Sequence, residues 1–138
     1  MKKTVTLLVV VVAAFALCAQ TVTYLPVKWR FWVDGSSYVA RIGREAVVNS
    51  PVWDPSRPLP LSFAKAEIIA RRALRKIVAD EPAWNVASFS ILRVQNTSSW
   101  YYMVELIPGS RREKQTTGFR VLIDSAGKPG RIEPGTFE

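Results

Sequence analysis

The chain has 138 residues, of which 49% are hydrophobic, and its 19 basic and 11 acidic side chains give a formal net charge of +8. This length suits a single domain with one core. Because the sequence contains no histidine and one cysteine, it excludes catalytic triads built on imidazole, disulfides within the chain, and imidazole or multi-thiolate metal sites.

The first residues have the layout of a secretory signal peptide. Lys2 and Lys3 precede an almost unbroken apolar run over residues 5–17, and small side chains follow. We expect cleavage near residue 19, so that residues 1–19 are removed and the protein is periplasmic or secreted. Loss of two lysines from a net charge of +8 leaves the mature chain at +6.

Two other interpretations of this segment stay open. If the leader is retained, residues 4–19 anchor the protein in the membrane, although a full span needs about 20 apolar residues and this run is shorter. The second alternative is lipidation at Cys18, the only cysteine. A lipoprotein signal has a small residue directly before that cysteine, whereas this sequence has Leu17.

The next segment predicts a strand and a hairpin. Residues 27–33 mostly alternate apolar and basic side chains, which is typical of a half-buried strand. Residues 34–37 supply turn chemistry, since Gly35 adopts positive φ without steric cost. Residues 38–48 are the expected return strand, with Gly43 as an interruption.

A proline-rich connection follows over residues 49–61. Its four prolines lack backbone donors, so neither a helix nor a central strand persists there. We expect Trp53, an aromatic residue among prolines, to pack down as a plug on the core. Residues 20–60 thus form the hairpin and loop part of the domain.

The strongest structural signal is a helix that begins after Ser62. Serine is a favoured N-cap, and the Asp80-Glu81-Pro82 sequence ends the pattern. The apolar positions follow the spacing of one buried helix face: Ala66, Ile69, Ala70, Ala73, Leu74 and Ile77.

Strand-like runs then follow to the C-terminus, over residues 88–94, 100–107, 118–124 and 131–133. One helix followed by short-looped strands predicts an α+β fold, with one main helix packed across an antiparallel sheet of three to five strands. Residues 61–138 would form one domain with residues 20–60. Alternation gives the helix an apolar floor made of Trp100, Tyr102, Val104, Leu106, Phe119, Val121 and Ile123.

One short motif resembles a catalytic one. Ser62 and Lys65 have the Ser-x-x-Lys spacing of penicillin-binding enzymes, but the companion Ser-Asp-Asn and Lys-Thr-Gly motifs are absent from the sequence. We therefore interpret Ser62 as a helix cap and Lys65 as a solvated side chain.

Two carboxylates are candidates for acid-base chemistry. Glu105 and Asp124 are potential neighbours across paired strands, yet alternation points Glu105 away from the apolar face. An ion pair with Arg93 or Arg120 on an adjacent strand is the ordinary explanation. We predict a protein that is not an enzyme and holds neither a cofactor nor a metal ion.

Basic side chains gather on the polar helix face and on the 108–117 loop. They are a candidate contact surface for an anionic polymer or lipid of the envelope, and export makes nucleic acid an unsuitable partner. The alternative is a solvated helix face. We call this set the basic patch, and it comprises Lys65, Arg71, Arg72, Arg75, Lys76, Arg111, Arg112 and Lys114.

Three stretches share features with a known family. They are the helix with Ala66, Ala70 and Ala73, then Trp100-Tyr101-Tyr102-Met103-Val104-Glu105-Leu106, then Phe119-Arg120-Val121-Leu122-Ile123-Asp124-Ser125-Ala126-Gly127-Lys128. A Tyr-x-Val-Glu strand before a strand that ends in an Asp-x-x-Gly-Lys turn resembles the PepSY-type domains of exported proteins. The likeness covers about residues 61–134, and cystatin-like folds share this α+β topology.

The resemblance implies a non-catalytic module of the kind linked to restraining or escorting proteases and to envelope regulation. It transfers no binding residues. We therefore expect an exported binding module that contacts a protein partner through an exposed sheet edge or the concave sheet face. The alternative is a basic adaptor for an anionic envelope polymer or lipid.

Overall fold

The structure is a computed structural model that describes residues 26–95 and 97–136. The expected signal peptide of residues 1–19, the alternative anchor of residues 4–19 and the lipidation candidate Cys18 lie outside these residues. None of the helices in the described ranges is both long and apolar enough to cross a bilayer.

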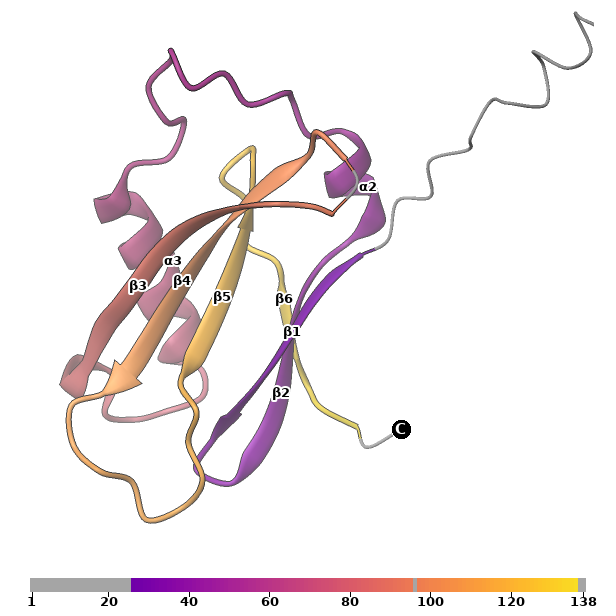
Figure 1. Ribbon diagram of the computed structural model, residues 1–138. Helices are drawn as coiled ribbons and strands as arrows, with labels where there is room; N and C mark the ends of the chain where they lie inside the picture. Colours follow the sequence, from indigo (N-terminus) through magenta and orange to yellow (C-terminus); the bar gives the residue numbers. More distant parts are fainter. Residues whose placement is uncertain (1–25, 96, 137–138) are drawn as a thin grey trace, which may run out of the picture.

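The described chain forms two three-stranded antiparallel sheets and one substantial helix (Figure 1). One sheet has the strand order β3-β4-β5 and the other has the order β1-β2-β6. The elements in chain order are β1 (Val27–Val33), β2 (Ser36–Ile42), α2 (Arg44–Val48), α3 (Phe63–Leu74), the 3-10 helix η1 (Glu81–Ala83), β3 (Trp84–Arg93), β4 (Trp100–Pro108), β5 (Phe119–Asp124) and β6 (Arg131–Pro134).

The expected N-terminal hairpin is confirmed, but its second strand is shorter than predicted. Asp34 and Gly35 both have positive φ, as a tight two-residue turn requires. β2 ends at Ile42, which pairs with Val27 at the very start of β1. Beyond Ile42 the backbone leaves the sheet and forms α2, so the prediction of a strand to residue 48 was wrong.

The predicted helix is confirmed as α3. The backbone N–H of Lys65 donates a hydrogen bond of 3.3 Å to the Ser62 hydroxyl, which establishes the expected cap. Ala66, Ala70 and Leu74 are fully buried. The helix ends at Leu74, earlier than predicted, and Ile77 lies in the turn that follows.

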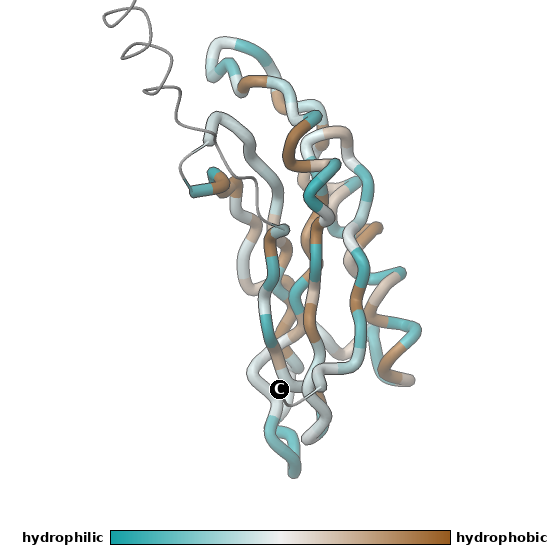
Figure 2. Tube along the Cα trace, turned by 90° about the vertical axis from the view of Figure 1, so that its right-hand side faces the viewer, coloured by the Kyte–Doolittle hydropathy of each residue, from teal (hydrophilic) through white to brown (hydrophobic). Residues whose placement is uncertain are grey.

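The single sheet that we predicted is divided into two. The apolar floor on β4 and β5 is buried beneath α3 as expected. However, β6 pairs with β2, and the second sheet packs along the edge of β5 that β4 leaves free. From β1, Trp29 reaches the opposite face of β4, where its indole N–H donates to the Tyr101 hydroxyl at 3.1 Å. Figure 2 shows hydrophobic and hydrophilic positions alternating along extended segments of the chain.

Trp53 does not form the predicted plug. Its side chain is 42% exposed, and its ring lies tilted over that of Trp100 with 6.5 Å between centroids. Trp100 is itself only 5% exposed, and its indole N–H donates to the Pro51 carbonyl at 2.9 Å. Because Trp100 already closes the core at this point, Trp53 lies above it.

The chain passes from one sheet to the other at Gly130. The N–H of Gly130 donates to the Leu122 carbonyl in β5 at 2.8 Å, and the next residue, Arg131, pairs with Arg41 in β2. A Cβ atom at position 130 would collide with the Arg41 carbonyl oxygen. Only glycine therefore fits where the two sheets meet.

We expect Gly130→Ala to lower the free energy of unfolding by about 1–3 kcal/mol, because the added methyl group forces two backbones apart. Gly43→Ala is the matched control, since its new Cβ has open space within 4 Å. It should change stability by less than about 0.5 kcal/mol, because the gain from a stiffer unfolded chain is offset by the poorer N-capping of α2 by alanine. Urea denaturation of both variants measures this, and equal effects would contradict the proposed contact.

Candidate functional site

A groove of about 640 Å³ lies between α3 and β6. We call it the α3/β6 groove. One wall is residues 129–134 at β6, and the other wall is the helix and the turn after it, through Ile69, Arg72, Ala73, Lys76 and Ile77.

The floor of the groove is apolar. Ile69, Ala73 and Ile77 on the helix side and Ile132 on the strand side are half-buried and pack against the core. Ala73 is the smallest of the four, so it leaves a depression between the two larger side chains on its own wall. Half-buried apolar side chains in a concave site are what a ligand or a protein segment covers on binding.

The rim of the groove is basic. Arg72 and Lys76 are exposed, and no carboxylate within residues 26–95 and 97–136 forms an ion pair with either. Glu133, the acidic residue among those that line the groove, is instead paired with Arg41 at 3.7 Å. The groove therefore carries uncompensated positive charge.

β6 is an edge strand, and within residues 26–95 and 97–136 no backbone group pairs with the side of β6 that faces away from β2. The N–H of Gly135 donates to the Ser37 carbonyl at 2.7 Å, and the register places Ile132 opposite Ala40. Because hydrogen-bonded and non-hydrogen-bonded pairs alternate in an antiparallel ladder, the N–H and C=O of Ile132 point away from β2. Pro134 has no N–H, so Ile132 carries the free donor of this edge.

Two members of the predicted basic patch are engaged within the fold. Arg71 donates to Glu67 at 2.8 Å, to Glu81 at 3.0 Å and to the Trp84 carbonyl at 3.1 Å. Arg75 donates to the other oxygen of Glu81 at 2.8 Å. Glu81 is only 4% exposed, so these two arginines balance a buried carboxylate and fix η1 against α3.

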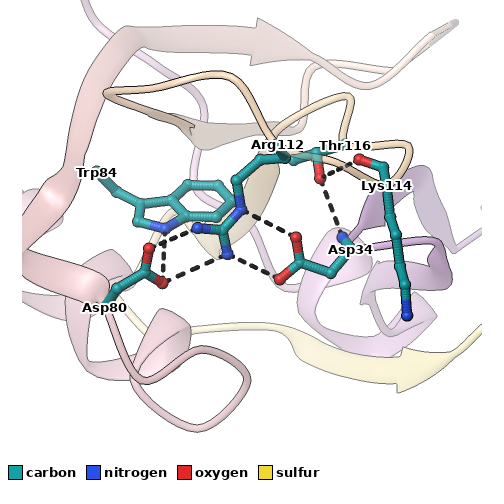
Figure 3. Close-up of polar contacts among 6 residues, drawn as sticks. All are labelled: Asp34, Asp80, Trp84, Arg112, Lys114 and Thr116. Carbon is teal, nitrogen blue, oxygen red and sulfur yellow. Dashed lines mark hydrogen bonds and ion pairs between the residues drawn. The ribbon is translucent and has the colours of Figure 1, made fainter.

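Arg112 is a third member that the fold uses internally (Figure 3). Its guanidinium donates to both carboxylate oxygens of Asp34, at 2.9 and 2.7 Å, and to Asp80, while it lies 5.3 Å above the Trp84 ring. These carboxylates raise the pKa of Arg112, and its hydrogen bond lowers the pKa of Asp80. We call this arrangement the Arg112 clamp; it ties the 108–117 loop to the β1–β2 turn and to η1.

The structure thus divides the basic patch. Arg71, Arg75 and Arg112 are neutralised by internal ion pairs. Arg72 and Lys76 flank the groove. The other members, on the first turn of α3 and on the 108–117 loop, have no ion pair within the described ranges: Lys65, Arg111 and Lys114.

The candidate acid-base residues have structural partners. Glu105 accepts a hydrogen bond from Arg120 at 2.7 Å, which confirms the predicted ion pair with an arginine on an adjacent strand. Asp124 accepts backbone N–H bonds from Ala126 and Lys128 at 3.0 and 2.8 Å, which hold the turn after β5. Within the part of the chain that the structure describes, no three His, Cys, Asp or Glu residues gather in a way that would hold a metal ion.

Sequence reasoning missed the strand wall of the groove. Ile132 and the unpaired edge of β6 become visible only once β6 is known to pair with β2. Ala73 was correctly placed on the inward side of the helix, but its position in an open groove depends on the same pairing. The one available signal was the glycine before β6, which marks a close approach of two backbones.

Comparison of the chain with protein-family models, with curated proteins and with solved structures finds no match. The function is therefore inferred from the groove, its open strand edge and its charges.

Acid should weaken the fold through Glu81. Hydrogen bonds from Arg75 and then Arg71 hold the pKa of Glu81 below its ordinary value of 4.5. A carboxyl group with a lowered folded-state pKa contributes stability that is complete above its unfolded pKa and is lost as pH falls through the folded value. We expect the urea midpoint to decline between about pH 5 and pH 3.

Glu81→Gln should lower the midpoint at pH 6 and make the decline toward pH 3 smaller than in the wild type. Glu113→Gln removes an exposed loop carboxylate without an ion pair in the described ranges and serves as the control. Urea titrations at several pH values measure both. An unchanged pH profile in Glu81→Gln would show that the two arginines do not act through this carboxylate.

Proposed function

We propose that the chain is a non-catalytic binding module that contacts a protein partner through the α3/β6 groove. The observation that carries this proposal is an apolar groove with a strand edge on one wall and unneutralised basic side chains on its rim. Its volume of about 640 Å³ lies in the range of ordinary binding sites, about 300–1,000 Å³.

The edge of β6 favours a protein over a small molecule as the partner. Unpaired N–H and C=O groups on an edge strand are a template for another extended chain. Strand addition uses such an edge for main-chain hydrogen bonds, while neighbouring pockets select side chains. Ile132 offers the backbone groups and Ala73 the depression, so both requirements are met at one place.

The sequence features point in the same direction. Residues 61–134 resemble PepSY-type domains, which implies a partner related to proteases or to envelope regulation. The leader expected in residues 1–19 supports a periplasmic or secreted location, where such a partner would be found. Retention of residues 4–19 would instead keep the module at the membrane.

A second candidate function is that of a basic adaptor for an anionic envelope polymer or lipid. It is favoured by five members of the basic patch without ion pairs in the described ranges: Lys65, Arg72, Lys76, Arg111 and Lys114. Attraction of this kind weakens once salt shortens the Debye length well below about 10 Å. A protein seated on an apolar groove would be retained under the same conditions.

The test is affinity capture from envelope extracts at low and high salt, with the immobilised wild-type protein and two variants. Ala73→Arg places a long side chain in the groove and preserves helix propensity. Ile68→Arg introduces the same side chain at an exposed position on another face of α3, where the native residue is 58% exposed. We expect a protein that survives high salt with the wild type and Ile68→Arg and is absent with Ala73→Arg.

Release of all bound material at high salt would instead support the adaptor. A captured protein that is equally retained by Ala73→Arg would exclude the groove as its site. Turnover of a substrate by the purified protein would contradict a non-catalytic role. Circular dichroism of both variants establishes that they keep the wild-type fold.

A further inference from the structure

We propose that the α3/β6 groove takes an extended peptide segment with carboxylate side chains at alternate positions, which adds a strand to the β1-β2-β6 sheet at Ile132. This inference rests on the proposed function and specifies the chemistry of the partner. It follows from three properties of the groove: its length, its open backbone edge and the spacing of its charges.

The length of the groove suits a short extended segment. α3 and β6 both run lengthwise through the molecule (Figure 1). On the helix side, the α3 part from Ile69 to Leu74 measures about 7.5 Å at a rise of 1.5 Å per residue, and the turn on to Ile77 adds about 6 Å at roughly 2 Å per residue. The four residues of β6 span about 13 Å at 3.3 Å per residue. Both walls therefore accommodate about four residues of an extended peptide, whereas a helix about 10 Å wide would not reach the backbone of β6.

The backbone edge fixes where the peptide pairs. The N–H and C=O of Ile132 point away from β2, and a strand that used them would lie about 4.8 Å from β6. Ile69, Ala73 and Ile77 line the same groove as this edge, so a strand added there would face the half-buried apolar side chains of the opposite wall. A side chain of valine or isoleucine size on the peptide would fill the depression at Ala73 and cover the half-buried apolar floor.

The spacing of the basic side chains selects the flanking residues. Arg72 lies in the last turn of α3, and Lys76 lies about one turn further on, in the tighter turn that follows the helix; both line the groove. Residues i and i+2 of a strand share one face and are about 6.8 Å apart. Two carboxylates at alternate positions therefore match the two cations, with one apolar residue between them that faces the depression.

The acidic residues near Arg72 and Lys76 form ion pairs with other arginines. Glu67 is paired with Arg71 at 2.8 Å, and Glu133 is paired with Arg41 at 3.7 Å. The pattern acid-apolar-acid in an extended conformation is thus complementary to the groove in charge, in shape and in backbone hydrogen bonding.

The probe is an acetylated and amidated peptide, Ser-Glu-Val-Glu-Val-Glu-Ser, with a fluorescent label for anisotropy measurements on the purified exported protein. The Ser-Lys-Val-Lys-Val-Lys-Ser peptide is its charge control. A version N-methylated at the central glutamate and both valines is the backbone control. We expect the acidic peptide to bind at least about tenfold more tightly than either control, because removal of one strong charged or backbone interaction changes affinity by a factor of that size.

Two lysine variants with the same charge change separate local contact from general attraction. Lys76→Glu alters the rim of the groove, and Lys65→Glu alters the first turn of α3, outside the groove lining. We expect Lys76→Glu to weaken the acidic peptide about tenfold and to strengthen the lysine peptide. Lys65→Glu should leave both affinities within about twofold of the wild type, as expected for an exposed charge at a distance.

Equal weakening by Lys65→Glu and Lys76→Glu would overturn the inference, because it would reduce binding to net charge. Equal affinity of the N-methylated peptide would overturn strand addition. If Lys76→Glu binds the lysine peptide more tightly, its weaker binding of the acidic peptide is not caused by misfolding, since an unfolded variant would bind neither peptide.

The capture experiment keeps this inference distinct from the proposed function. If a partner depends on Ala73 while no acidic peptide binds, the function stands and the acidic strand is wrong. If no captured protein depends on the groove, the proposed function fails, and acidic peptide binding alone does not rescue it.

Discussion

The close approach of Gly130 to the Arg41 carbonyl is the constraint on which the arrangement of the two sheets depends. At this point the chain stops pairing with β5 and begins to pair with β2. If β6 had continued along β5, it would have extended the β3-β4-β5 sheet by one strand. Because β6 turns away, its outer edge is left beside α3, and the groove exists as a consequence of one residue without a side chain.

Basic side chains with the same formal charge have two different roles in this protein. Arg71 and Arg75 compensate the buried Glu81, and Arg112 joins two aspartates over an indole ring. Arg72, in the last turn of α3, and Lys76, in the turn after it, line the groove, and no carboxylate of the described residues forms an ion pair with either. Helical spacing is the physical reason for this division, since neighbouring positions on a helix face different surroundings.

Local features of the fold were predictable from sequence, and pairing between distant strands was not. The cap at Ser62, the turn at Gly35 and the buried floor beneath α3 each follow from a few adjacent residues, and the structure confirms them. The division into two sheets depends on which strand β6 pairs with. Alternation identifies the faces of a strand but not its neighbours, so the α2 segment and the strand wall of the groove were missed.

The site was predictable to the same partial extent. Composition and spacing identified Arg72 and Lys76 as members of a basic surface, and the helix pattern identified Ala73 as inward-facing. Sequence could not show that Arg112 is held by Asp34, 78 residues earlier in the chain. Ion pairs between such distant positions decide which charges are available, and only the folded arrangement reveals them.

The Arg112 clamp has a consequence for the order in which the chain assembles. Its two carboxylates lie 78 and 32 residues away in sequence. The ion pairs of Arg112 therefore require that the β1–β2 hairpin and the segment after α3 are both already packed in place. Contacts over such separations carry a high loop-closure cost. We therefore expect the first part of the 108–117 loop to become ordered late in folding, and loss of the clamp to free that part while hydrogen bonds from residues 115–117 to β1 and its turn persist.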